Sequence, residues 1–81
     1  MPISIARLEP AAIDVQCDVA VLRVTLADGR EISAPMEWFP RLRDATPAQR
    51  AHWRLIGRGE GIHWQEIDED VSVNALLGLP S

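Results

Sequence analysis

The residues with the widest range of possible chemistry are concentrated in the segment 61–70, whose sequence is GIHWQEIDED. It combines an imidazole, an indole and several carboxylates. Such side chains could ligate a metal ion, transfer protons in catalysis or contact a partner. Each of these roles needs a particular spacing of residues, so the spacing decides between them.

A metal site would need two imidazoles and a carboxylate in a suitable arrangement. The spacing of His52 and His63 matches no zinc-binding motif. The acidic run 68–70 lacks the alternating acceptors, the central Gly and the final Glu of an EF-hand loop. We therefore expect no metal ion and no cofactor.

Nucleophilic catalysis has little support in the sequence. Cys17 is the single cysteine, and neither of its neighbours is a His or Arg that would lower the pKa of its thiol. No Gly-x-Ser-x-Gly elbow is present. The glycines of segment 57–61 follow a predicted helix, whereas a phosphate-binding loop leads into one. We expect a protein without enzymatic activity.

Aromatic and arginine side chains are the remaining candidates, because protein interfaces use both as anchors. We expect the core to take Trp53 and at least one other aromatic residue, and we expect Trp38 and Trp64 to form an exposed edge. The predicted partner-binding residues are Trp38, Arg41, Arg43, His63, Trp64 and Asp68.

A β-hairpin is the clearest of the elements that would position these residues. Segments 19–26 and 30–34 alternate in polarity and flank Asp28-Gly29. A two-residue loop would place Leu26 opposite Glu31 and mix the two faces. A loop at 27–29 solves this, so we predict a type I turn with Gly29 left-handed. The predicted cross-strand pairs are Leu26 with Arg30, Val24 with Ile32, and Leu22 with Ala34.

A helix is predicted to start at Thr46-Pro47-Ala48-Gln49, which has the pattern of a capping box. It should run to about Ile56 and end at Gly57 as its C-cap. Its predicted buried stripe contains Ala48, Ala51, Leu55 and Ile56, with His52 partly buried and with Arg50 and Arg54 on the outer side.

Three further elements are expected with less regular patterns. Residues 3–8 and 62–64 alternate as strands, and residues 11–18 form a connection. Ser72 should cap a short helix at 73–77, with the acidic run 68–70 leading into it. The predicted fold is a single α+β domain over residues 1–81. It has a small, mainly antiparallel sheet of three to four strands, one main helix and a short C-terminal helix.

Composition narrows the functional classes. An apolar content of 47% and a charged content of 25% over 81 residues are typical of a folded domain. The net charge of −4 disfavours direct nucleic-acid binding, which usually requires a basic patch. No apolar run approaches the roughly 20 residues of a membrane helix, and no export signal is visible. We expect a cytoplasmic protein whose exposed strand edges permit a homodimer.

Several motifs also occur in a characteristic order: Asp28-Gly29-Arg30, Trp38-Phe39-Pro40-Arg41-Leu42, Gly61-Ile62-His63-Trp64, Asp68-Glu69-Asp70 and Leu76-Leu77. In these the chain resembles the bacterial domain-of-unknown-function family 2442. The resemblance implies an α+β domain similar to the N-terminal domain of some helix-turn-helix regulators. It also implies a gene beside that of another small uncharacterised protein, an arrangement similar to toxin and antitoxin pairs.

The preferred hypothesis is therefore a non-enzymatic interaction module that binds a small protein encoded nearby, in an antitoxin-like role. Segments 38–43 and 62–70 would form the contact. One alternative is a regulatory or sensory domain linked to transcription. Another is a small-ligand-binding domain built around His63, Trp64 and Asp68.

Overall fold

The computed structural model describes residues 8–78 and contains two three-stranded antiparallel sheets in this range. The first sheet has the order β1 (Ala12–Cys17), β2 (Val21–Leu26), β3 (Glu31–Pro35). The second has the order β4 (Trp53–Ile56), β5 (Gly61–Trp64), β6 (Glu69–Ser72). The helices are η1 (Met36–Trp38), α1 (Pro40–Arg43), α2 (Pro47–Ala51), η2 (Gln65–Ile67) and α3 (Val73–Leu76).

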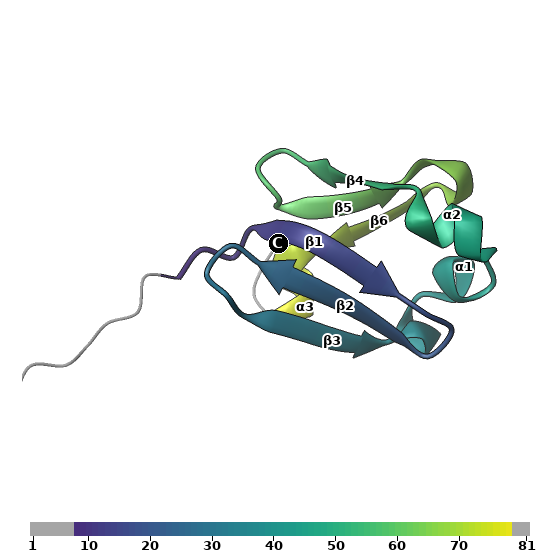
Figure 1. Cartoon of the computed structure of the whole chain (residues 1–81), viewed down its shortest axis with the longest axis horizontal. Coiled ribbons are helices and arrows are strands. Elements are labelled where there is room, and N and C mark those ends of the chain that lie inside the picture. The colour runs from purple at the N-terminus through teal and green to yellow at the C-terminus, as the bar shows by residue number, and fades with distance from the viewer. Residues whose placement is uncertain (1–7, 79–81) are drawn as a thin grey trace, which may run out of the picture.

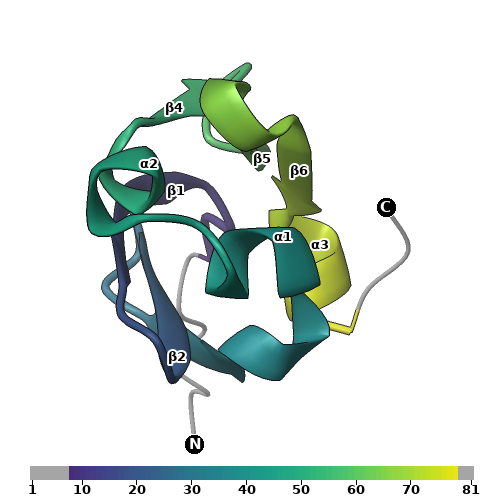
Figure 2. The same cartoon turned by 90° about the vertical axis from the view of Figure 1, so that its right-hand side faces the viewer.

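The two sheets lie on opposite sides of a shared core (Figure 1). Helices α1 and α2 cover one end of the space between the sheets, and α3 follows β6 along one side (Figure 2). The α+β class is thus confirmed, but a single sheet with one main helix is not what forms. Every helix among residues 8–78 is short, and none is long and apolar enough to cross a membrane.

The hairpin of β2 and β3 forms with the predicted loop. The backbone N–H of Gly29 donates to the carbonyl of Leu26 at 3.0 Å, and Gly29 has a φ of 93°. The N–H of Leu26 donates to the carbonyl of Arg30 at 2.8 Å. The predicted pairs Leu22 with Ala34 and Val24 with Ile32 are both present.

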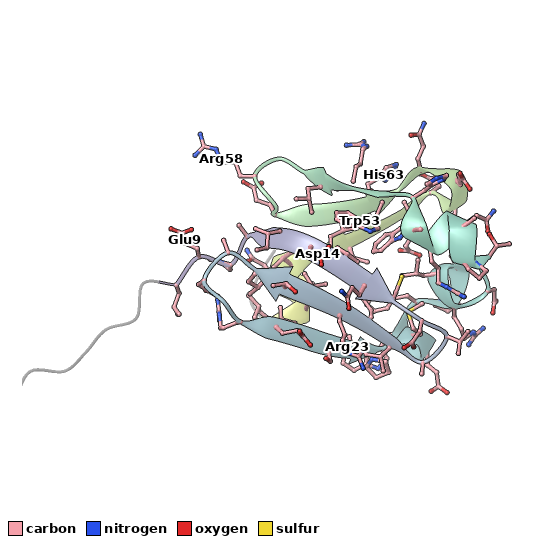
Figure 3. The ribbon with its side chains drawn as sticks, in the orientation of Figure 1. Glu9, Asp14, Arg23, Trp53, Arg58 and His63 are labelled. Carbon is pink, nitrogen blue, oxygen red and sulfur yellow. The ribbon has the colours of Figure 1, made fainter. Side chains whose placement is uncertain are left out.

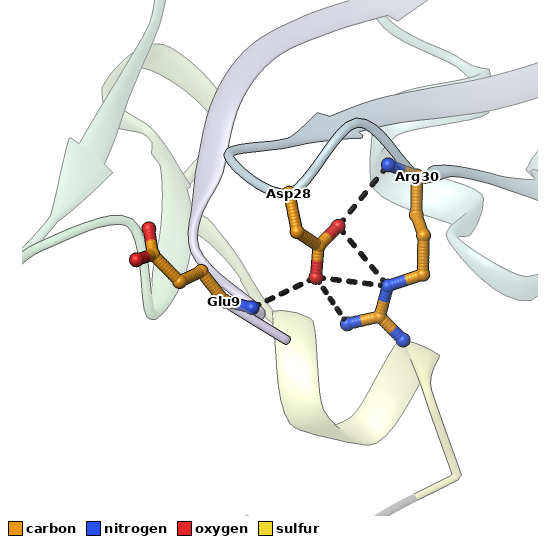
Figure 4. Close-up of polar contacts among 3 residues, drawn as sticks. All are labelled: Glu9, Asp28 and Arg30. Carbon is orange, nitrogen blue, oxygen red and sulfur yellow. Dashed lines mark hydrogen bonds and ion pairs between the residues drawn. The ribbon is translucent and has the colours of Figure 1, made fainter. Parts of the chain in front are cut away.

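Asp28 holds this turn against the chain that precedes β1 (Figure 4). Its carboxylate accepts the backbone N–H of Glu9 at 2.8 Å and that of Arg30 at 3.1 Å, and it pairs with the Arg30 guanidinium at 2.8 Å. The hydrogen bond from the Arg30 side chain is the main cause that lowers the pKa of Asp28 to about 2.

Strand β1 occupies a segment that was predicted to be a connection. The pairing with β2 shifts between Ala12 and Asp14, where Ile13 bulges outward and is exposed. Because of this bulge, the buried residues Ala12 and Val15 are three positions apart, which hides the period of two. The strand predicted at 3–8 lies outside the described residues except for Leu8, which is not in a strand.

The capping box at the start of α2 is confirmed, but the helix is half as long as predicted. The N–H of Gln49 donates to Thr46 Oγ1 at 3.1 Å, and the N–H of Thr46 donates to Gln49 Oε1 at 2.9 Å. The helix ends at Ala51, and residues 53–56 form β4 instead. Gly57 therefore lies in the turn between β4 and β5 and is not a helix C-cap.

The burial predicted for this helix is reversed. Ala48 and Ala51 are exposed, whereas Arg50 is only 7% exposed. Arg50 Nη1 donates to the carbonyls of Arg43 at 3.2 Å and Ala45 at 2.9 Å, where α1 ends. These carbonyls carry partial negative charge and satisfy the buried cation. In β4, Leu55 is half-buried and Ile56 is exposed, as the alternation of a strand requires.

The C-terminal helix is capped as predicted, by Ser72, whose Oγ accepts the N–H of Ala75 at 3.2 Å. The acidic run does not lead directly into it. Asp68 has a left-handed φ of 51°, and Glu69 and Asp70 belong to β6. The two valines at 71 and 73 are buried and draw this segment into the sheet.

Candidate partner-binding site

Strand β6 is an edge strand that pairs with β5 alone among residues 8–78. A groove of about 450 Å³ follows it, lined by Trp38, Phe39, Glu69, Asp70, Val71, Ser72, Ala75 and Leu76. All four residues of β6 line this groove. Since successive side chains of a strand point to opposite faces, the groove must run along the backbone edge of β6.

Trp38 also lines the groove and is 66% exposed. Its position follows from the short helix η1. Pro35 ends β3, Met36 is fully buried, and the N–H of Phe39 donates to the Met36 carbonyl at 2.9 Å. The tight turn anchored by Met36 leaves Trp38 on the outside, while Phe39 packs against the core. An exposed indole next to a free strand edge is a candidate contact for a partner.

Arg41 connects the two segments that were predicted to form one surface. Its Nη1 donates to the carbonyl of Asp68 at 3.1 Å, so α1 is joined to the residue that precedes β6. Trp38, Arg41 and Asp68 therefore belong to one side of the molecule. Arg43 lies on the same helix but pairs with its neighbour Asp44 at 3.0 Å, and the Arg43 hydrogen bond lowers the pKa of Asp44.

Trp64 is not part of an exposed edge, contrary to expectation. It is completely buried, and its Nε1 donates to the carbonyl of Arg50 at 3.0 Å. Strand β5 is the middle strand of its sheet, and Ile62 and Trp64 both point into the core. A period of two correctly groups these residues on one face, but it does not say which face is inside.

His63 lies between those two residues on the outer face of the sheet (Figure 3). Its Nδ1 pairs with Asp70 Oδ1 across β5 and β6. His52 is exposed rather than partly buried, because α2 ends before it, and its Nδ1 lies 2.6 Å from Glu66 Oε1. Both imidazoles border an open groove of about 600 Å³, which also contacts Trp53, Arg54 and Gln65.

Among residues 8–78, in this groove or elsewhere, no group of three or more His, Cys, Asp or Glu side chains could together hold a metal ion. Cys17 is half-buried, and its Sγ lies 3.6 Å from the Arg50 carbonyl. Burial raises the pKa of the Cys17 thiol, which makes it a poor nucleophile at neutral pH.

The edge of β6 is the feature that sequence reasoning missed. Segment 70–73 alternates between polar and apolar residues, because Val71 and Val73 are separated by Ser72 and preceded by Asp70. This short alternation indicates a strand, but the acidic side chains and the cap at Ser72 favoured the start of a helix instead.

The comparisons with known proteins agree with this fold. Residues 12–79, from β1 through α3, match the family described as Protein of unknown function (DUF2442). A crystal structure of a protein of unknown function from Rhodospirillum rubrum is similar, with a TM-score of 0.69 and 26% sequence identity over 85% of this chain and 87% of that chain. No curated protein matches. The match across nearly the whole chain confirms the resemblance seen in its motifs, and the protein belongs to the DUF2442 family.

Proposed function

We propose that this protein is a non-enzymatic interaction module that binds a small protein partner. The contact is the β6 surface, which we define as Trp38, Phe39, Arg41, Asp68 and strand β6. The observation that carries the proposal is the exposure of Trp38, 66%, beside a strand edge that is unpaired among residues 8–78. A partner would cover both features at once.

The chemistry of the β6 surface supports this role. Tryptophan and arginine are the side chains that contribute most to binding energy when an interface forms. Arg41 is already held by the Asp68 carbonyl, so part of its conformational entropy has been lost before binding. The indole and the guanidinium therefore offer a partly ordered contact surface.

The proposed partner is the small protein encoded nearby, and the proposed role is antitoxin-like. Support for this partner comes from the gene arrangement that family membership implies. The net charge of −4 supports a partner of opposite charge, since complementary charge speeds association and excludes acidic competitors.

Co-expression with the product of the neighbouring gene, followed by size-exclusion chromatography, tests the proposal. The two proteins should elute together. Trp38→Ala should weaken the complex at least about tenfold, because a central aromatic anchor is lost. The matched control is Leu8→Ala, which removes a 61% exposed apolar side chain near Glu9, at the opposite end of the molecule (Figure 3).

The control variant should bind as well as the original protein. Two separate elution peaks for the unmodified proteins would refute the specific partnership. Equal losses in Trp38→Ala and Leu8→Ala would show that the contact is not on the β6 surface.

A further inference from the structure

We infer that the partner contributes an extended, basic segment that pairs with β6 as a fourth strand of the second sheet. The inference rests on the proposed function and adds to it a binding mode and a chemical class of partner. Strand addition supplies affinity through backbone hydrogen bonds and specificity through alternate side chains.

The alternation of hydrogen-bonded pairs between β5 and β6 shows which backbone groups of β6 are available to an added strand. The N–H of Val73 donates to the carbonyl of Glu60 at 3.0 Å, one position beyond the pair Gly61 and Ser72. In an antiparallel ladder, hydrogen-bonded and non-hydrogen-bonded pairs alternate. Position 71 therefore bonds to β5 like position 73, whereas positions 70 and 72 direct their N–H and C=O groups away from it.

The hydrogen bond from Arg41 to the Asp68 carbonyl agrees with this alternation. Asp68 lies two positions before Asp70, so its carbonyl should point to the same free edge, and that is the carbonyl which Arg41 Nη1 reaches. The carbonyl of Ser72 begins α3 and serves its first turn. The groups left for an added strand are the N–H and C=O of Asp70 and the N–H of Ser72.

The length of the β6 edge suits one short extended segment. Four residues of strand extend for roughly 13 Å. Arg41 marks one end of this edge and the N-cap of α3 marks the other. Trp38, Phe39 and Leu76 line the same groove, so side chains of an added strand would contact these apolar groups.

The charges around the groove determine the side chains that this segment should carry. Glu69 and Asp70 line the groove, and no Arg or Lys is among the described residues that do so. Since Glu69 and Asp70 point to opposite faces of β6, Arg or Lys at alternate positions of an added strand would meet one of these two carboxylates, and a cation could also stack on Trp38. A second copy of this chain would instead bring its own Glu69 and Asp70 against them, which disfavours self-pairing.

The test measures binding of fluorescein-labelled peptides to the full chain by fluorescence anisotropy. The probe is the hexapeptide Arg-Val-Arg-Val-Arg-Val. One control replaces each Arg by Glu, and a second is N-methylated at every residue, which keeps the charges but removes the ladder donors. The probe should bind at concentrations below about 1 mM, and each control should bind at least about tenfold more weakly.

Two variants at one position separate the backbone from the charge. Asp70→Ala and Asp70→Pro both remove the carboxylate that pairs with His63. Only Asp70→Pro also removes the outward N–H, and proline is tolerated where an edge N–H faces away from the sheet. The probe should bind Asp70→Pro at least about tenfold more weakly than Asp70→Ala. Circular dichroism melts check that both variants fold.

The outcomes distinguish this inference from the proposed function. Equal binding to Asp70→Ala and Asp70→Pro, with undiminished binding of the N-methylated peptide, overturns strand addition. If Trp38→Ala still disrupts the complex with the neighbouring protein, the β6 surface remains the contact. Absence of probe binding overturns the basic-strand inference whatever co-expression shows. Should Asp70→Pro fail to fold, the N-methylated peptide decides.

Discussion

The second sheet makes different contacts at its β4–β5 turn and at the outer edge of β6. The turn is held against the first sheet, because the N–H of Ala12 in β1 donates to the carbonyl of Gly59 at 2.8 Å. A Cβ on Gly59 would clash with the Ala12 carbonyl oxygen. The outer edge of β6 borders a groove and pairs with no further strand among residues 8–78.

This difference shows that the fold fixes the sheet at its β4–β5 turn and leaves the backbone edge of β6 without a strand partner among residues 8–78. Natural sheets usually cover, shorten or charge their edges to prevent unwanted pairing. Here β6 is short and carries Glu69 and Asp70, which discourages pairing with acidic strands without blocking the backbone. The turn is therefore a structural contact, whereas the β6 edge is the proposed binding contact.

The largest expected difference in unfolding free energy is between substitutions of Trp64 and of Trp38. Trp64→Ala should lower the free energy of unfolding by about 3 to 5 kcal/mol, because it leaves a cavity and removes the hydrogen bond to the Arg50 carbonyl. Trp38→Ala should change it by less than about 0.5 kcal/mol. Urea unfolding followed by circular dichroism measures both, and similar losses would contradict the comparison.

Gly59→Ala should directly disrupt the contact between the β4–β5 turn and β1. The substitution places a methyl group against the backbone of β1 at a φ of 90°, so we expect a loss of roughly 2 to 4 kcal/mol in unfolding free energy. Gly29→Ala is the matched control, because Gly29 has a φ of 93° and nothing within 4 Å of its added Cβ. It should cost only about 1 to 2 kcal/mol. Equal melting temperatures for the two variants would show that β1 yields to the new methyl group.

The two helix caps offer a smaller comparison. Thr46 caps α2, ahead of β4, in a reciprocal capping box, and Ser72 caps α3 at the end of β6 with a single bond. Thr46→Ala should cost about 1 kcal/mol, and Ser72→Ala about half of that. Chemical denaturation of each variant gives the values. A larger loss for Ser72→Ala would mean that α3 matters more to the fold than α2.

The smallest effect depends on pH and concerns the contact that fixes the chain before β1. Asp28 has a folded pKa of about 2, below its ordinary value of 3.8. Its stabilising contribution is therefore complete above about pH 4 and is lost as the pH falls through about 2. Between pH 5 and pH 2.5, Asp28→Asn should lose less stability than the original protein. Parallel losses in urea midpoints would remove Asp28 from this role.

Elements with local signals were predictable. The β2 and β3 hairpin depends on Asp28-Gly29 and on alternation over a few neighbouring residues, and its register followed from matching apolar positions. The capping box at Thr46 and the cap at Ser72 are also local. The family could be identified because its motifs recur in order along the chain.

Elements that depend on long-range packing were not predictable. Residues 53–56 fit a helix or a strand equally well, and contact with β5 and β1 decides for the strand. The bulge at Ile13 concealed β1. For the candidate site, the structure joins the predicted residues Arg41 and Asp68 and leaves Trp38 exposed, but it buries Trp64, because the inner face of a central strand is set only when the two sheets meet.

The left-handed turn at Asp68 also limits how the length of the chain can vary. The turn fixes which residues of β6 face the core after η2. Val71 faces inward, and the backbone N–H and C=O of Asp70 point to the free edge. An insertion of one residue at this turn would move Val71 to solvent and exchange the exposed backbone groups. A change of length between Ile67 and Glu69 should therefore not be tolerated, and single-residue insertions in this turn, scored by folded yield, would show the loss.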